Sequence, residues 1–240
     1  MTQNFFVAID FDGTITNKDI TDAVIQKFAK PGWEEPEELW VQGVIGSKKC
    51  LELQMGLIET PLSQLMDFVD GFTIDRAFLN FAGFLREYRI PHGIISDGFH
   101  VFAKRILQNY GLEDIPIYAN GLKEENGILK TLFPYSKTDC PSGVCKCMVA
   151  NNISKGDPVI LIGDGRSDFC IAEKAVFVFS KNKLTNYCKT NGVFHAPFKD
   201  FNDIEGYLRV LVSHMAADPK GLLSDMKLPL RGLKYEDSRT

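Results

Sequence analysis

Four short apolar segments, each rich in Val, Ile or Phe, constrain most strongly what this chain can fold into. They are FFVAID at 5–10, IPHGIISD at 90–97, DPVILIGD at 157–164 and AVFVFS at 175–180. Such runs are typical of strands that are buried on both faces of a sheet. Helical patterns at 78–89 and 101–111 lie between them. Strands that alternate with helices predict an α/β fold with a parallel sheet.

Residues 17–75 break this alternation. Four short amphipathic segments without a strand between them, ITDAVIQKFAK, PEELWVQGVI, SKKCLELQMGLI and PLSQLMDFVDGF, predict a small helical insert after the first strand. Two apolar runs around KEENG predict a β-hairpin over 117–133. The last stretch, 220–240, has no clear period, and we expect a loosely docked tail there.

Composition excludes several classes of protein. With 45% apolar and 24% charged residues, the 240-residue chain has the profile of a globular protein. The net charge is −4, and no Lys/Arg stripe is interleaved with aromatics, so we expect no nucleic-acid partner. No apolar run approaches bilayer length and the N-terminus lacks a secretory signal pattern, so we expect a cytoplasmic protein without a membrane partner. The six cysteines are then expected to be reduced thiols.

Paired carboxylates end the first predicted strand. Asp10 and Asp12 are two positions apart, so they can address the same point beyond the strand end. Burying two like charges together is costly unless a cation or a reaction uses them. Asp164 ends another predicted strand and reaches the same point if the two strands are neighbours. Three such carboxylates would form an oxygen-ligand site of the kind Mg²⁺ prefers.

Four motifs occur in a fixed order: DFDGT, the serine of IISDG, a lysine, and GDGRSD. Together they resemble the motifs of the haloacid-dehalogenase-like (HAD-like) phosphatase superfamily, and the helical insert lies where its phosphoserine-phosphatase-like branch has a cap. KFAKPGW, CPSGVCKC and FHAPFKDF are similar to features of the 2-hydroxy-3-keto-5-methylthiopentenyl-1-phosphate phosphatases of methionine salvage. The loop after Ser96 reads DGF, where that resemblance predicts two glycines.

The resemblance implies a role for each catalytic residue. Asp10 would be the nucleophile that forms an aspartyl-phosphate, and Asp12 the general acid and base. Lys146 would neutralise the phosphate, although Lys137 and Lys155 lie close in the sequence. The metal ligands would be Asp10, Asp12 and Asp164, holding Mg²⁺.

Further residues would surround these. Thr14, Ser96 and Asp97, together with Lys146, would bind the phosphate. Asp168 would orient Lys146 or a metal-bound water. Asp19 lies where the branch has an acidic substrate contact, and capping of a helix is an equal alternative.

We therefore expect a Rossmann-like, HAD-like three-layer core over 1–16 and 76–240, with a helical cap over 17–75. The expected function is Mg²⁺-dependent hydrolysis of a small phosphomonoester by a monomer or homodimer. The alternative substrates are phosphoserine, phosphoethanolamine and phosphocholine. From another class, the alternative is a non-catalytic phospho-ligand binder or a phospho-receiver. Structural zinc at Cys140, Cys145 and Cys147 is a weaker possibility, because three thiols in a C-x4-C-x-C pattern do not match the usual paired spacing.

Overall fold

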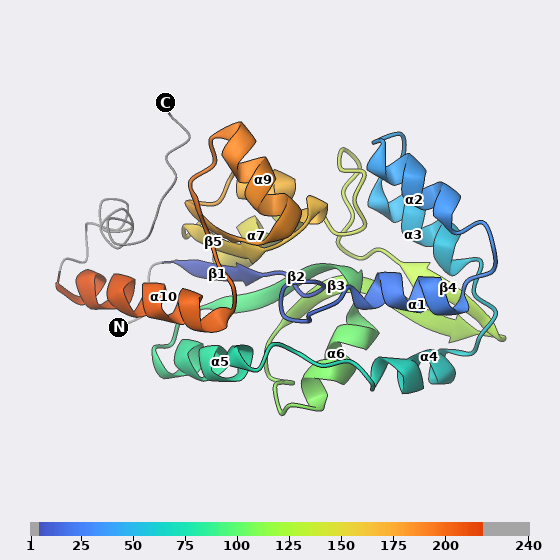
Figure 1. The fold of residues 1–240 in the computed structure, drawn as a ribbon, viewed down its shortest axis with the longest axis horizontal. Coiled ribbons are helices and arrows are strands. Elements are labelled where there is room, and N and C mark those ends of the chain that lie inside the picture. The colour runs from blue at the N-terminus through green and yellow to red at the C-terminus, as the bar shows by residue number, and fades with distance from the viewer. Residues whose placement is uncertain (1–4, 218–240) are drawn as a thin grey trace.

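A computed structural model of the protein describes residues 5–217 (Figure 1). Its strands are β1 (Phe6–Ile9), β2 (His92–Phe99), β3 (Ile117–Glu125), β4 (Ile128–Leu132), β5 (Val159–Gly163), β6 (Phe177–Ser180) and β7 (His195–Pro197). They form one sheet in the order β4-β3-β2-β1-β5-β6-β7. Neighbouring strands are parallel except for β3 and β4, which form an antiparallel hairpin. The four predicted strands and the predicted hairpin are confirmed.

Helices cover both faces of this sheet (Figure 1). They are α5 (Ala77–Glu87), α6 (His100–Gln108), α7 (Lys146–Ser154), α8 (Phe169–Ala172), α9 (Asn182–Asn191) and α10 (Phe201–Ala217), with a 3₁₀ turn η1 (Arg166–Asp168). Successive side chains of β1 point to opposite faces of the sheet and so contact both helical layers. Val7 and Ile9 belong to the hydrophobic cluster with α5, α6 and α10. Phe6 and Ala8 belong to the second cluster, with α7, α8 and α9. The expected three-layer, Rossmann-like core is therefore confirmed.

The insert after β1 contains four helices, as its amphipathic segments predict. They are α1 (Ile20–Phe28), α2 (Glu34–Val41), α3 (Ser47–Met55) and α4 (Leu62–Val69). Helices α2 and α3 pack on each other, and α3 also packs against β4. Helix α4 packs against α6, and its buried Leu65 and Val69 belong to the same hydrophobic cluster as the core helices. The insert thus packs against the core at two places, at helix α6 through α4 and at strand β4 through α3 (Figure 1).

Some elements were not predicted from the sequence. Strand β7 was not predicted, because it has only three residues. Helix α7 was not predicted, because it follows a cysteine-rich stretch without apolar periodicity. The tail expected at 220–240 lies outside the described residues. Across residues 5–217, the helices are all too short or too polar to cross a membrane.

Candidate active site

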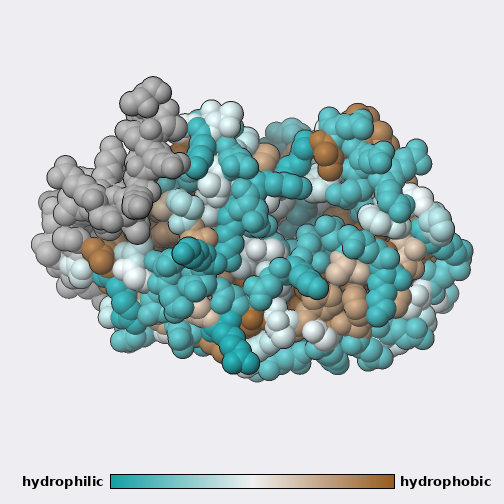
Figure 2. Space-filling view, viewed as in Figure 1, coloured by the Kyte–Doolittle hydropathy of each residue, from teal (hydrophilic) through white to brown (hydrophobic). Residues whose placement is uncertain are grey.

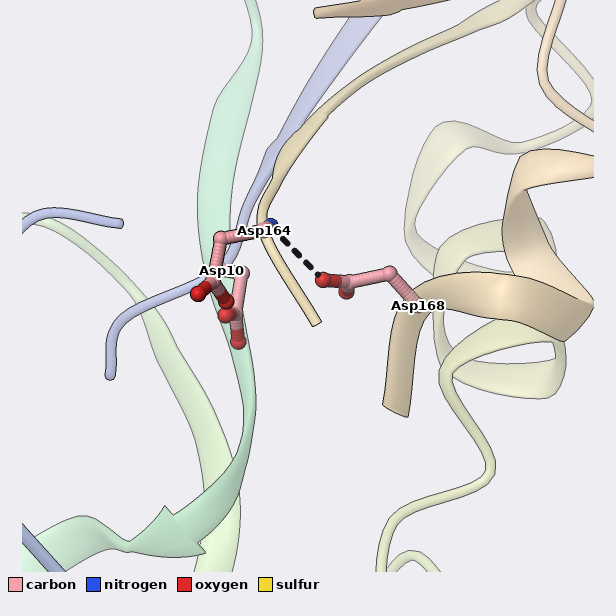
Figure 3. Close-up of side chains that lie close together, drawn as sticks. All are labelled: Asp10, Asp164 and Asp168. Carbon is pink, nitrogen blue, oxygen red and sulfur yellow. Dashed lines mark hydrogen bonds between the residues drawn. The ribbon is translucent and has the colours of Figure 1, made fainter. Parts of the chain in front are cut away.

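Two aspartates lie side by side at the carboxyl edge of the sheet. Strand β1 pairs in parallel with β5, with Ile9 opposite Ile162, so Asp10 and Asp164 each follow the end of neighbouring strands. Figure 3 shows both carboxylates together, with Asp168 approaching from the end of η1, just before α8. Oxygen atoms of Asp10, Asp164 and Asp168 lie within 4.8 Å of one another. The edge therefore carries a compact group of carboxylates.

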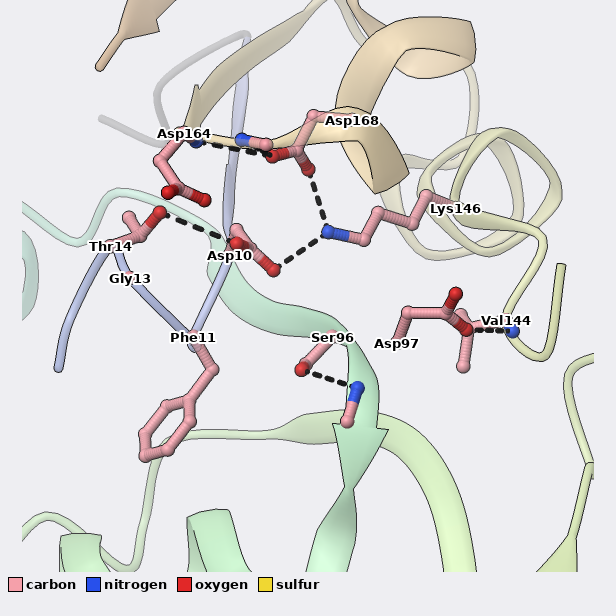
Figure 4. Close-up of polar contacts among 12 residues, drawn as sticks. Asp10, Phe11, Gly13, Thr14, Ser96, Asp97, Val144, Lys146, Asp164 and Asp168 are labelled. Atoms are coloured by element: carbon pink, nitrogen blue, oxygen red, sulfur yellow. Dashed lines mark hydrogen bonds and ion pairs between the residues drawn. The ribbon is translucent and has the colours of Figure 1, made fainter. Parts of the chain in front are cut away.

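Lys146 reaches this group from the first turn of α7 (Figure 4). Its Nζ donates to Oδ1 of Asp10 at 2.7 Å and to Oδ1 of Asp168 at 2.6 Å. Burial lowers the pKa of Lys146, but the neighbouring carboxylates raise it more, so the pKa lies above its usual range. The rival lysines lie elsewhere: Lys137 pairs with Asp139 on the surface, and Lys155 ends α7.

Asp168 is fully engaged by the protein. Besides accepting from Lys146 through Oδ1, it accepts through Oδ2 from the backbone N–H of Asp164 at 3.2 Å and of Gly165 at 3.3 Å. A carboxylate with both oxygens occupied in this way orients its donors. It holds the turn after β5 and the Lys146 ammonium in fixed positions.

Positive charge is in deficit at this edge. The three carboxylates share the single ammonium group of Lys146. The pKa of Asp10 is raised, chiefly by burial and next by the negative charge of Asp168. Burial also raises the pKa of Asp164. Closely spaced carboxylate oxygens with too little positive charge are the donor set that suits a hard divalent cation. Asp10 and Asp164, which follow neighbouring strands, therefore fit Mg²⁺, whereas Asp168 already accepts three hydrogen bonds from Lys146 and the turn after β5.

Two glycines make room for the carboxylates. Gly13 has φ +73°, and a Cβ there would lie 2.6 Å from Oδ2 of Asp164. A Cβ at Gly98 would lie 2.2 Å from Oδ2 of Asp12. Both distances are far below van der Waals contact, so a side chain at either position would displace an acidic group.

Asp12 lies outside the compact group and lines the adjoining cavity. Its Oδ1 accepts from the backbone N–H of Ile20 at 2.9 Å, at the start of α1. Burial raises the pKa of Asp12 to about 7. This carboxyl group is thus suited to exchange protons near neutral pH.

The predicted phosphate-binding hydroxyls are buried beside Asp10. The Thr14 hydroxyl donates to Oδ2 of Asp10 at 3.3 Å. The Ser96 oxygen accepts from the backbone N–H of Gly98 at 3.0 Å, which fixes the side chain of Ser96 at the end of the regular part of β2. Both hydroxyls therefore lie at the edge occupied by the carboxylates.

Asp97 and Asp19 both line the cavity but are bound to other protein groups. The carboxylate of Asp97 accepts from the backbone N–H of Val144 and from the Ser47 hydroxyl. Asp19 caps α1, because its Oδ1 accepts from the backbone N–H of Asp22 at 2.9 Å. The capping alternative for Asp19 is therefore observed, while its contact with a substrate stays a prediction.

A cavity of about 390 Å³ lies between the carboxylate edge and the insert. In Figure 2 the surface is hollowed between the part formed by α9 and the part formed by α2 and α3. Insert residues that line the cavity include Asp22, Glu37, Trp40, Cys50 and Gln54. Nothing in the sequence marked Glu37 or Gln54 as cavity residues, because contacts of a helical insert depend on how it packs.

Asn182 was also missed. Its side-chain amide donates to Oδ2 of Asp164 at 3.1 Å. It is the second residue after β6, so the rule that polar groups gather after parallel strands could have identified it.

Comparisons with known proteins show which proteins this chain is similar to. A family model described as Putative Phosphatase matches residues 5–176. A 2-hydroxy-3-keto-5-methylthiopentenyl-1-phosphate phosphatase from Brevibacillus brevis is 31% identical over 213 residues, covering 85% of this chain and 95% of the relative. One from Geobacillus kaustophilus is 29% identical over 210 residues, with the same shares covered. A solved structure of a phospho-aspartyl intermediate analogue of phosphoserine phosphatase has a TM-score of 0.68 at 18% identity, covering 86% of this chain and 99% of that chain. This last likeness shows a HAD-like fold.

Proposed function

The chain belongs to the Putative Phosphatase family, within the HAD-like phosphatases, and we propose that it hydrolyses a small phosphomonoester through an aspartyl-phosphate on Asp10. The observation that carries this proposal is the contact of Lys146 with Asp10, beside Asp164 at one edge of the sheet. The neighbour with 18% identity, which is a phospho-aspartyl analogue by its description, supports the same assignment.

In the first step, a carboxylate oxygen of Asp10 attacks phosphorus and the bond from phosphorus to the leaving oxygen breaks. Asp12 donates its proton to that leaving oxygen. In the second step, Asp12 takes a proton from water, which attacks phosphorus and releases inorganic phosphate, and Asp10 is regenerated. The half-buried position of Asp12, with its pKa raised to about 7, supports both proton transfers.

Three groups would hold the phosphate while Asp10 reacts. Lys146 supplies a fixed positive charge, and the hydroxyls of Thr14 and Ser96 supply hydrogen-bond donors. A carboxylate repels phosphate, so any contact from Asp97 would come from its backbone N–H. Thr14 lies in the turn after β1, Ser96 lies on β2, and Lys146 begins α7.

Mg²⁺ would be held by Asp10 and Asp164, and would supply charge neutralisation of the phosphate. Asp12 was predicted as the third ligand. Because a protonated carboxyl group is a poor ligand, Asp12 would serve better through its backbone carbonyl oxygen, which leaves its side chain free for proton transfer. Asp168 orients Lys146 in this proposal.

We also propose that residues 17–75 act as a cap on the core formed by 1–16 and 76–240. Helices α2 and α3 carry Trp40 and Gln54, which line the cavity opposite the carboxylate edge. A cap in this position would exclude water and contact the leaving group, while the core holds the phosphate.

The named relatives support 2-hydroxy-3-keto-5-methylthiopentenyl-1-phosphate as substrate. A second candidate class, amine-bearing esters such as phosphoserine, phosphoethanolamine and phosphocholine, is favoured by the acidic cavity wall of Asp19, Asp22 and Glu37. Trp40 adds an aromatic face of the kind that attracts cations.

Steady-state kinetics with Mg²⁺ on these four esters decides between the classes. The highest kcat/KM on the enol phosphate supports the salvage substrate, and the highest value on an amine ester supports the second class. Sustained turnover of none of them, and none of p-nitrophenyl phosphate, would overturn the proposed function.

A further inference from the structure

Asp97 connects three separate parts of the chain through one carboxylate. Its Oδ2 accepts from the hydroxyl of Ser47, the first residue of α3 in the insert. Its Oδ1 accepts from the backbone N–H of Val144 at 2.8 Å and from Nδ2 of Asn120, on β3, at 3.3 Å. In Figure 4 the Asp97 side chain points toward Val144 and away from Lys146 and Asp10. Both oxygens of its carboxylate therefore accept hydrogen bonds from the protein.

The segment 141–144 is the one that leads into α7 and Lys146. It contacts the start of α3 directly, because the backbone N–H of Gly143 donates to the Ser47 oxygen at 3.2 Å. The backbone N–H of Lys48 donates to the carbonyl oxygen of Pro141 at 3.3 Å. A Cβ at Gly46 would lie 1.9 Å from that same carbonyl oxygen, so only glycine allows this approach.

We propose that Asp97 is a positioning residue that couples the position of helix α3 on the core to the position of Lys146. Ser47 and segment 141–144 bind the same carboxylate and also each other, so a displacement of one disturbs the anchoring of the other. Lys146, the first residue of α7, is only two positions after Val144 in the sequence. The catalytic consequence rests on the proposed function, whereas the coupling of the two segments does not.

Hydrogen exchange measured by mass spectrometry tests the coupling without any substrate. Ser47→Ala removes the two bonds of the insert, to Asp97 and from the N–H of Gly143, while the bond between Val144 and Asp97 stays. Coupling predicts that the amide of Val144 exchanges about tenfold faster in this variant. Asp97→Ala should accelerate exchange both there and through the first turn of α3. Ser213→Ala, which deletes an exposed hydroxyl bonded to Val210 on α10, is the matched control and should leave both segments unchanged. A wild-type rate at Val144 in Ser47→Ala overturns the proposal.

Kinetics with p-nitrophenyl phosphate test the effect on Lys146. If Ser47 only bounded the cavity, Ser47→Ala would raise KM and leave kcat unchanged. Coupling instead predicts a roughly tenfold lower kcat, with recovery in Ser47→Thr, which keeps the hydroxyl. An unchanged kcat in Ser47→Ala overturns the proposal. An inactive wild-type protein would contradict the proposed function, and the exchange experiment would still decide the coupling.

Discussion

The ammonium nitrogen of Lys146 lies 2.7 Å from Oδ1 of Asp10, and the two side chains are only 1% and 5% exposed. The residues are 136 positions apart, so this contact exists only in the folded chain. Water cannot solvate either charge, and each depends on the other for compensation. The pair therefore links stability to the proposed chemistry.

Replacing Lys146 should reduce both activity and stability. Lys146→Ala leaves the carboxylates of Asp10 and Asp168 without their buried partner, which is expected to cost about 3–5 kcal/mol of unfolding free energy. Loss of a preorganised charge at the phosphate should lower kcat about 10²–10³-fold. Urea denaturation and steady-state kinetics measure the two effects. Lys137→Ala, which removes a surface lysine paired with Asp139, is the control and should change neither.

Asp10→Asn should abolish turnover while the fold is retained. The amide has nearly the shape of the carboxylate but is not a nucleophile toward phosphorus. Circular dichroism and p-nitrophenyl phosphate hydrolysis test the two parts. Mass spectrometry of wild type after brief exposure to substrate should locate the phosphoryl group on Asp10. A variant with wild-type turnover would refute the nucleophile assignment.

Activity should require a divalent cation. Excess EDTA is expected to stop p-nitrophenyl phosphate hydrolysis, and added Mg²⁺ to restore it, because the carboxylates of Asp10 and Asp164 otherwise repel the substrate. Asp164→Asn should raise the Mg²⁺ concentration for half-maximal activity about tenfold or more. Asp157→Asn removes a carboxylate before β5 and serves as the control. Full activity in EDTA would contradict the cation requirement.

The sequence predicted the carboxylate edge because that edge depends on local rules. Asp10 and Asp164 follow apolar strands, and parallel strands place their ends together. The insert helices were predicted for the same reason, since each has its own apolar period. The choice of Lys146 over Lys137 rested on resemblance, because lysines in sequence carry no sign of burial.

The network around Asp97 could not be predicted in this way. Ser47, Asn120 and Val144 are each at least 23 positions away from Asp97, and they meet through packing between the insert and the core. Strand β7 was missed because three residues are too few to show a period. Pairings of this kind are set by tertiary structure, and single-sequence patterns record only local periodicity.

A pH-dependent contribution to stability is expected where the insert meets α6. Asp70, which ends α4, accepts from Nε and Nη2 of Arg105 at 2.6 Å each. The Arg105 hydrogen bonds lower the pKa of Asp70 to about 2, against an unfolded value of about 3.9. The folded state therefore binds this proton less readily than the unfolded state. The contribution is complete above about pH 4 and is lost as the pH falls toward 2.

Asp70→Asn should accordingly lower Tm at pH 7, by a small amount because the pair is exposed to solvent. The difference from wild type should shrink as the pH falls from 4 and vanish near pH 2. Differential scanning calorimetry of both proteins between pH 2 and 7 measures this. Asp67→Asn removes an exposed carboxylate from the same helix and should not reproduce the pH dependence. A Tm difference of the same size at pH 7 and pH 2 would show that the charge of Asp70 is not its source.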